Sequence, residues 1–158
     1  MLKDLAEELD EWFVQQAQEA RREGMASPRA CTIRVHGQMA LFERGVRLNL
    51  VATQDVDAST NLSHAARAEF ERILAKRHLI LDPVGHEAWM PAETEYETFY
   101  SGQFVTLKVA DEESVLLSKA AKAPEKNAAL LTEYLATGAS ERFFTLAAKY
   151  RVDLEQFV

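Results

Sequence analysis

Cysteine, long apolar runs and positive charge are all scarce in this chain, and each shortage excludes a class of protein. The single cysteine, Cys31, rules out a disulfide framework and a cysteine-rich zinc site. No apolar stretch approaches the length of a membrane span, and the acidic, amphipathic start of the chain is unlike a secretory signal. The formal charge of −7 argues against a broad surface for DNA or RNA. We therefore expect a cytoplasmic protein with no membrane contact.

Metal-ligand spacing is also missing among the four histidines. His86-Glu87-Ala88-Trp89 lacks the second histidine of a metalloprotease helix, which excludes that class of enzyme. No internal repeat, low-complexity tract or linker interrupts the chain. With 158 residues, of which 47% are hydrophobic, the sequence predicts one globular domain over residues 1–158.

The hydrophobic pattern predicts an α+β fold, with an N-terminal helix over 1–24, a mixed sheet and its helices over 30–110, and helices over 111–158. Ser63, Asp111 and Ser140 are the expected helix N-caps. Residues 84–101 read as a loop. The expected strands are 31–36, 46–58, 78–81 and 103–109, and the other expected helices are 38–43, 63–77, one after residue 111, 125–136 and 140–150.

Two aspartates stand one residue apart in Thr53-Gln54-Asp55-Val56-Asp57, directly after the apolar run 48–52. On a strand both side chains point to the same face, with Cα atoms ~6.6 Å apart. Two such carboxylates can converge on one hard cation, and Mg²⁺ is commonly held by one or two carboxylates together with substrate phosphates. Taken alone, the triplet is better interpreted as solvent-facing residues at the end of a strand.

The order of strand, Gly37, short helix, strand and acid pair resembles the nucleotidyltransferase superfamily, the fold typified by DNA polymerase β. More narrowly, it is similar to bacterial nucleotidyltransferase-like proteins of abortive-infection and toxin–antitoxin systems. Gly37-Gln38-Met39-Ala40-Leu41 resembles the family's Gly-Gly-x-Ala-Leu turn, which holds the triphosphate. Residues 53–57 resemble its metal-binding Thr-x-Asp-apolar-Asp motif, and residues 115–120 resemble its Leu-Leu-x-x-Lys helix, whose lysine faces the nucleotide. Lys126-Asn127 stands where the family often has Lys-Asp.

This resemblance implies a small mixed sheet flanked by helices that binds a nucleoside triphosphate with Mg²⁺. It also implies transfer of a nucleotidyl group to a protein or RNA acceptor. Asp55 and Asp57 are the expected catalytic and metal-binding residues. The expected nucleotide-binding residues are Gly37, Gln38, Thr53, Lys119 and Lys122, and Arg47 is a further candidate for a phosphate contact.

Three departures separate this chain from the family pattern. Gln38 stands where the family has a second small residue, and the segment between Gly37 and Asp55 is longer than usual. Active members also supply a third carboxylate from a later strand, whereas the strand after residue 102 offers only Thr106 and Lys108 at its polar positions. The acids Asp82, Glu87, Glu95 and Glu97 are near in sequence but lie outside that strand.

These departures leave a second interpretation open, a catalytically inactive member that acts as a binding or regulatory module. Such a module would be antitoxin-like or part of a complex. If the protein is an enzyme, its sequence does not identify the preferred nucleotide base or the acceptor. If it is a module, the sequence does not distinguish a protein partner from a second copy in a homodimer. A third acid beside Asp55 and Asp57 would favour the enzyme, and Lys108 pointing into the site would favour the module.

Overall fold

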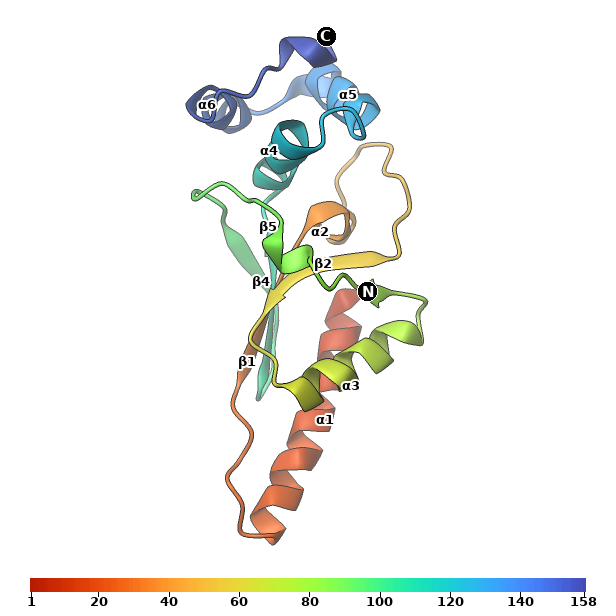
Figure 1. Cartoon of the computed structure of the whole chain (residues 1–158), viewed down its shortest axis with the longest axis vertical. Helices are drawn as coiled ribbons and strands as arrows, with labels where there is room; N and C mark the ends of the chain where they lie inside the picture. The colour runs from red at the N-terminus through yellow and green to blue at the C-terminus, as the bar shows by residue number, and fades with distance from the viewer.

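The chain folds around a five-stranded mixed sheet with helices against it and at one end (Figure 1). The computed structural model describes all residues, 1–158. The helices are α1 (Leu2–Arg22), α2 (Gly37–Glu43), α3 (His64–Ala75), η1 (Gly85–Glu87), α4 (Glu112–Lys122), α5 (Ala128–Gly138), α6 (Glu141–Lys149) and η2 (Glu155–Phe157), where η marks a 3-10 turn. The strands are β1 (Cys31–His36), β2 (Asp55–Thr60), β3 (Ile80–Leu81), β4 (Tyr96–Ser101) and β5 (Val105–Ala110). The predicted α+β fold with a mixed sheet is confirmed.

The strands lie in the order β3-β2-β1-β5-β4, so β1 is central. It runs antiparallel to β2 and parallel to β5, while β3 runs parallel to β2 and β4 antiparallel to β5. Ile33 and Val35 of β1 point to the same buried face as Leu107 and Val109 of β5, their partners in the register. Because successive side chains alternate between faces, the polar residues of these strands line the opposite face.

Helix α1 supplies much of the cover over the buried face. Leu2, Leu5, Leu9 and Phe13 recur at helical spacing and are all buried. The Phe13 ring stacks on Phe104 with ring centroids 5.7 Å apart. Burying each of these side chains stabilises the fold by about 1.5–3 kcal/mol. The apolar stripe along this helix is therefore core.

A carboxylate of α1 also fixes the β4–β5 hairpin. Asp10 is only 7% exposed, and its oxygens accept hydrogen bonds from the backbone N–H groups of Gln103, Phe104 and Val105 at 2.7–3.1 Å. The Tyr100 hydroxyl donates a longer bond of 3.4 Å to the same carboxylate. Because three backbone donors turn toward one buried acid, the charge of Asp10 is compensated and the hairpin is held against the helix.

The predicted N-caps are all confirmed. Ser63, Asp111 and Ser140 each accept a hydrogen bond from the backbone N–H three residues later, at 3.0–3.2 Å, and open α3, α4 and α6. Asp111 also pairs with Arg142 of α6. Burial raises the pKa of Asp111, but the N–H of Glu95 and the Arg142 guanidinium outweigh it, and the pKa lies below its usual value.

None of the helices combines the length and the apolar character that crossing a bilayer requires.

Two predicted elements are wrong, and a third is displaced. The strand expected over 46–58 begins only at Asp55, because residues 44–54 form a loop whose Asn49 N–H bonds to the Glu133 carboxylate of α5 rather than to a strand. The segment expected to be a loop contains β4, whose alternation is hidden by a bulge between Thr98 and Tyr100. The helix expected from residue 125 begins at Ala128, after a turn at 124–127.

Candidate functional site

Asp57 is packed against the glycine turn that begins α2. It lies opposite His36, the last residue of β1, and Gly37 follows with φ of +66°. A Cβ placed on Gly37 would come within 2.4 Å of Oδ2 of Asp57, so only glycine leaves room for this carboxylate. The structure thus brings Asp57 and Gly37 together, as the sequence predicts. Asp55 lies two residues earlier on the same face and is exposed, with its N–H donating to Oγ1 of Thr53 at 3.1 Å.

Asp82 is the acid that sequence reasoning could not place. It follows β3, which pairs in parallel with β2 so that Ile80 is opposite Asp55 and Leu81 is opposite Val56. The Asp82 N–H donates to the Val56 carbonyl, so one more step along this register puts Asp82 beside Asp57, where the two carboxyl groups interact. Burial and this contact with Asp82 together raise the pKa of Asp57, while the nearby His36 lowers it. The missed signal is the parallel pairing of two short strands.

Gly85, the first residue of η1, packs closely against Asp57. A Cβ on Gly85 would lie 2.9 Å from Cα of Asp57, so this glycine also permits a close approach. The Gly85 carbonyl accepts a 2.7 Å hydrogen bond from Nε2 of His36. The other ring nitrogen of His36 is buried without a partner, in a side chain that is 3% exposed. The sequence indicated no site role for His36, although its place directly before Gly37 is a usable signal.

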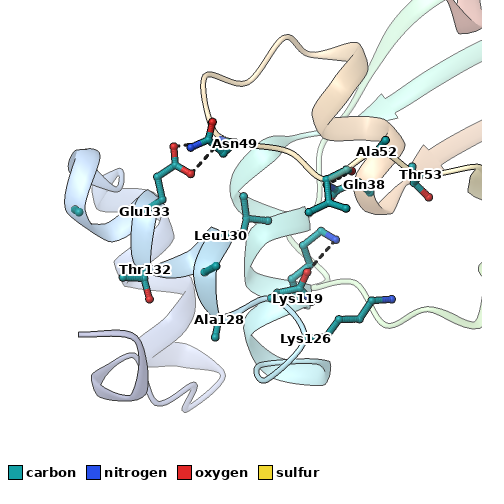
Figure 2. A pocket seen from close by; sticks show the side chains of 14 residues that line it. Gln38, Asn49, Ala52, Thr53, Lys119, Lys126, Ala128, Leu130, Thr132 and Glu133 are labelled. Carbon is teal, nitrogen blue, oxygen red and sulfur yellow. Dashed lines mark hydrogen bonds between the residues drawn. The ribbon is translucent and has the colours of Figure 1, made fainter.

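A cleft of about 930 Å³ lies between the 44–54 loop and helices α4 and α5 (Figure 2). Gln38, Thr53 and Lys119, three of the predicted nucleotide-binding residues, line it. Gln38 donates a 2.9 Å hydrogen bond from Nε2 to the Val51 carbonyl and so holds the loop. The remaining lining residues are Asn49, Val51, Ala52, Lys126, Asn127, Ala128, Ala129, Leu130, Thr132, Glu133 and Ala136.

Two lysines supply the positive charge of the cleft. Lys119 of α4 is half-buried, with Nζ 3.5 Å from Oδ1 of Asn127, and Lys126 precedes α5 (Figure 2). Neither forms an ion pair with a carboxylate. Burial and the charge of Lys126 lower the pKa of Lys119, while Asp57 opposes this shift from within electrostatic reach. An anion in the cleft would remove the repulsion between the two lysines.

Lys122 and Arg47, two further candidates for phosphate contacts, do not line this cleft. The Lys122 ammonium lies 5.5 Å from the centroid of the Trp89 ring, in a cation–π contact. Arg47 is an exposed residue of the 44–54 loop. Of the lysines on α4, only Lys119 is therefore placed to meet a ligand in the cleft.

Asp57 and Asp82 fit a metal site that is completed by a ligand better than a site built from protein side chains alone. No group of three or more histidine, cysteine, aspartate and glutamate side chains is arranged to enclose a metal ion. The carboxyl groups of Asp57 and Asp82 lie close enough to interact, and a divalent cation between them would offset their mutual repulsion. This donor set fits Mg²⁺ held by carboxylates with phosphate and water completing its shell, rather than by a cage made of protein alone.

Comparison of the chain with protein family models, curated proteins and solved structures found no match in any of the three. The candidate site is therefore assigned from its own residues.

Proposed function

We propose that this protein binds a nucleoside triphosphate with Mg²⁺ in the cleft and transfers its nucleotidyl group to an acceptor hydroxyl. One observation carries the proposal. Lys119 and Lys126, which lack carboxylate partners, occupy a cleft within electrostatic reach of Asp57, which is itself in contact with Asp82. Cations for phosphate oxygens thus line the cleft, and Asp57, which is outside its lining, is near enough to Lys119 for their charges to interact; this arrangement suits phosphoryl and nucleotidyl transfer.

The cleft also has an apolar part that suits a nucleoside. Val51, Ala128, Leu130 and Ala136 line it together with the hydroxyl of Thr132. A cleft of this volume is of the size that small ligands occupy in proteins. We therefore place the phosphates at the lysines and the base and sugar along α5.

In the proposed reaction, the acceptor oxygen bonds to the α-phosphorus, the bond between the α- and β-phosphates breaks, and pyrophosphate leaves. Lys119 and Lys126 neutralise negative charge on the phosphates. Asp57 and Asp82 are the residues that would hold Mg²⁺, with Asp55 exposed on the same face of β2, and Mg²⁺ would supply further charge neutralisation when bound. The proton of the acceptor hydroxyl passes to solvent water, because the acids that would hold Mg²⁺ are then not free to accept it.

The alternative is an inactive module of the same architecture, antitoxin-like or part of a complex. The absence of a three-residue metal cluster favours it. Two observations favour the enzyme instead. Asp82 contacts Asp57, and Lys108 is paired in the sheet with Arg34 and Thr98 and does not line the cleft.

The proposal is tested by calorimetric titration with Mg-ATP, Mg-GTP and Mg-CTP. We expect Lys119→Ala to weaken binding at least tenfold, because it removes a charge-assisted phosphate contact worth about 1.5–3 kcal/mol. Lys122→Ala is the matched control, since it removes the same charge from the same helix outside the cleft, and should leave binding unchanged. The Asp55→Ala, Asp57→Ala double variant should lose the dependence of binding on Mg²⁺.

Equal and weak binding of all three nucleotides to the wild type and to the double variant would count against a nucleotide site. An equal loss from Lys119→Ala and Lys122→Ala would show that general charge, not the cleft, attracts the nucleotide. Transfer itself is assayed by incubating the wild type with radiolabelled nucleotides and cell extract. A labelled product absent with the double variant supports the enzyme over the inactive module.

A further inference from the structure

One face of the sheet lies open to solvent over much of its area. Helices α1, α2 and α3 lie on the other side (Figure 1), where the buried residues of β1 and β5 point. Near Asp57, η1 covers the open face, but beyond it the side chains are exposed or half-buried. The register assigns these side chains to the open face: Thr32 and Arg34 from β1, Ser59 from β2, Tyr96, Thr98 and Ser101 from β4, and Thr106 and Lys108 from β5.

Two cations lie directly beside each other on this face. Arg34 and Lys108 are partners in the parallel register of β1 and β5. Neither forms an ion pair or a hydrogen bond from its side chain with another protein group. Like charges placed opposite each other on neighbouring strands destabilise a sheet. A protein with a net charge of −7 has acids available to neutralise such a pair, yet the open-face positions named above carry none, and Asp57 on the same face lies under η1.

The neighbours of the two cations are hydroxyls and an aromatic ring. Thr98 is opposite Lys108, and Ser59 is opposite Arg34. The Arg34 guanidinium lies 6.0 Å from the centroid of the half-buried Tyr96 ring. Arginine, lysine, serine and threonine side chains are the groups that proteins use for phosphate oxygens of a nucleic-acid backbone.

We propose that this open face binds the backbone of a single-stranded nucleic acid, with Arg34 and Lys108 each contacting a phosphate. Charge complementarity selects the partner, because the face offers two unneutralised cations among hydroxyl donors. Two cations in a chain of net charge −7 provide too little positive surface for the two closely spaced phosphate rows of a duplex. An acidic peptide would use the same cations but has less use for the hydroxyls.

The position of the face connects it with the candidate site. Ser59, opposite Arg34, is two residues from Asp57 on the same strand and the same face. A strand of nucleic acid lying over Arg34 and Lys108 can therefore extend toward the acid pair. The binding of nucleic acid to this face does not depend on the proposed function. Its role as the acceptor of the nucleotidyl group does rest on that function.

The experiment measures fluorescence anisotropy of labelled oligouridylate and oligoadenylate, ten nucleotides long, without nucleotide or Mg²⁺. At 50 mM salt, each phosphate contact with a single strand contributes about eightfold to affinity, from the dependence of such binding on salt. We expect Arg34→Ala and Lys108→Ala each to weaken binding about eightfold, and the double variant about 60-fold. The slope of log affinity against log salt should become shallower by about 1.4 in the double variant.

The control is Lys3→Ala with Arg21→Ala, which removes one lysine and one arginine from exposed positions of α1. This pair has the same net charge as the Arg34, Lys108 double variant and should bind like the wild type. The Arg34 and Lys108 variants should unfold at or above the melting temperature of the wild type, because the repulsive pair is removed. Equal losses in the test and control variants would overturn the proposal.

Tighter binding of a polyglutamate peptide with the same dependence on Arg34 and Lys108 would also overturn it, in favour of an acidic protein partner. The proposed function can fail separately. If oligonucleotide binding persists while Mg-nucleotide binding to the cleft is absent, the open face still binds nucleic acid, and only the acceptor role is lost.

Discussion

Replacing Gly37 by alanine tests the geometry of the candidate site without any ligand. The new Cβ would have to accept φ near +66° and would stand 2.4 Å from Oδ2 of Asp57. The left-handed conformation costs a non-glycine residue about 1–2 kcal/mol, and forcing an extra methyl into occupied space costs about 1–3 kcal/mol. We therefore expect Gly37→Ala to lower the free energy of unfolding by about 2–5 kcal/mol, a large share of the usual 5–15 kcal/mol.

A second glycine separates the two contributions. Gly45, at the other end of α2, has φ of +63°, and a Cβ on it would meet no atom within 4 Å. Gly45→Ala therefore measures the backbone cost alone, about 1–2 kcal/mol. The difference between the two variants is the cost of the contact with Asp57.

The assay is urea denaturation followed by circular dichroism, supported by the melting temperature, which for a chain of this size falls by about 2–4 °C per kcal/mol. Asp57→Ala combined with Gly37→Ala should recover about 1–3 kcal/mol, because the closest atom, Oδ2, is removed. If Gly37→Ala and Gly45→Ala cost the same, or if Asp57→Ala gives no recovery, Asp57 does not lie against the turn and the candidate site is assembled incorrectly.

Two further predictions concern the acids Asp57, which is half-buried, and Asp10, which is buried. Asp57→Asn should stabilise the protein at pH 7: the raised pKa of Asp57 means that the fold favours its protonated form, so the wild type loses stability as the pH rises from about 3.8 through the folded pKa. The melting temperature of Asp57→Asn should exceed that of the wild type at neutral pH, and this difference should disappear at the acid end of a series from pH 3 to 8. A constant difference at every pH would contradict a raised pKa for Asp57. Asp10→Ala should destabilise the protein by about 3–5 kcal/mol, because three backbone N–H groups of the β4–β5 hairpin lose their acceptor. Hydrogen exchange of these amides should accelerate, and Asp10→Asn, which keeps one acceptor oxygen, should cost less; equal effects of the two would argue that the charge alone matters.

Local chemistry predicted some parts of the fold well. The β-branched run at 31–36 gave β1 at its observed limits, and glycine at position 37 marked the turn into α2. Serine and aspartate caps fixed where α3, α4 and α6 begin. Each of these signals lies within a few residues of the feature that it determines. The strand β4 escaped prediction because its bulge puts Phe99 and Tyr100 out of alternation.

The parts of the site that were missed depend on contacts between distant segments. Asp82 reaches Asp57 only because β3 pairs in parallel with β2, a pairing of two residues that no local pattern announces. Lys119 and Lys122 lie three residues apart on one helix, and both were candidates for phosphate contacts, although only Lys119 matches the lysine of the family motif. They diverge because Trp89 packs beside Lys122 and the cleft opens beside Lys119. Sequence spacing brought both lysines to one region but could not show that Lys122 lies outside the cleft.

Two of the departures from the family pattern belong to one structural feature. The segment between Gly37 and Asp55 is long because residues 44–54 leave the sheet and form a wall of the cleft. Gln38, which replaces a small residue, donates its amide hydrogen bond to the Val51 carbonyl of that same loop. The other fixed point of the loop is the Glu133 carboxylate, which accepts from the Asn49 N–H. A longer loop needs such attachments to stay ordered, so the glutamine is explained as the partner of the insertion. Neither departure therefore counts independently against a ligand in the cleft.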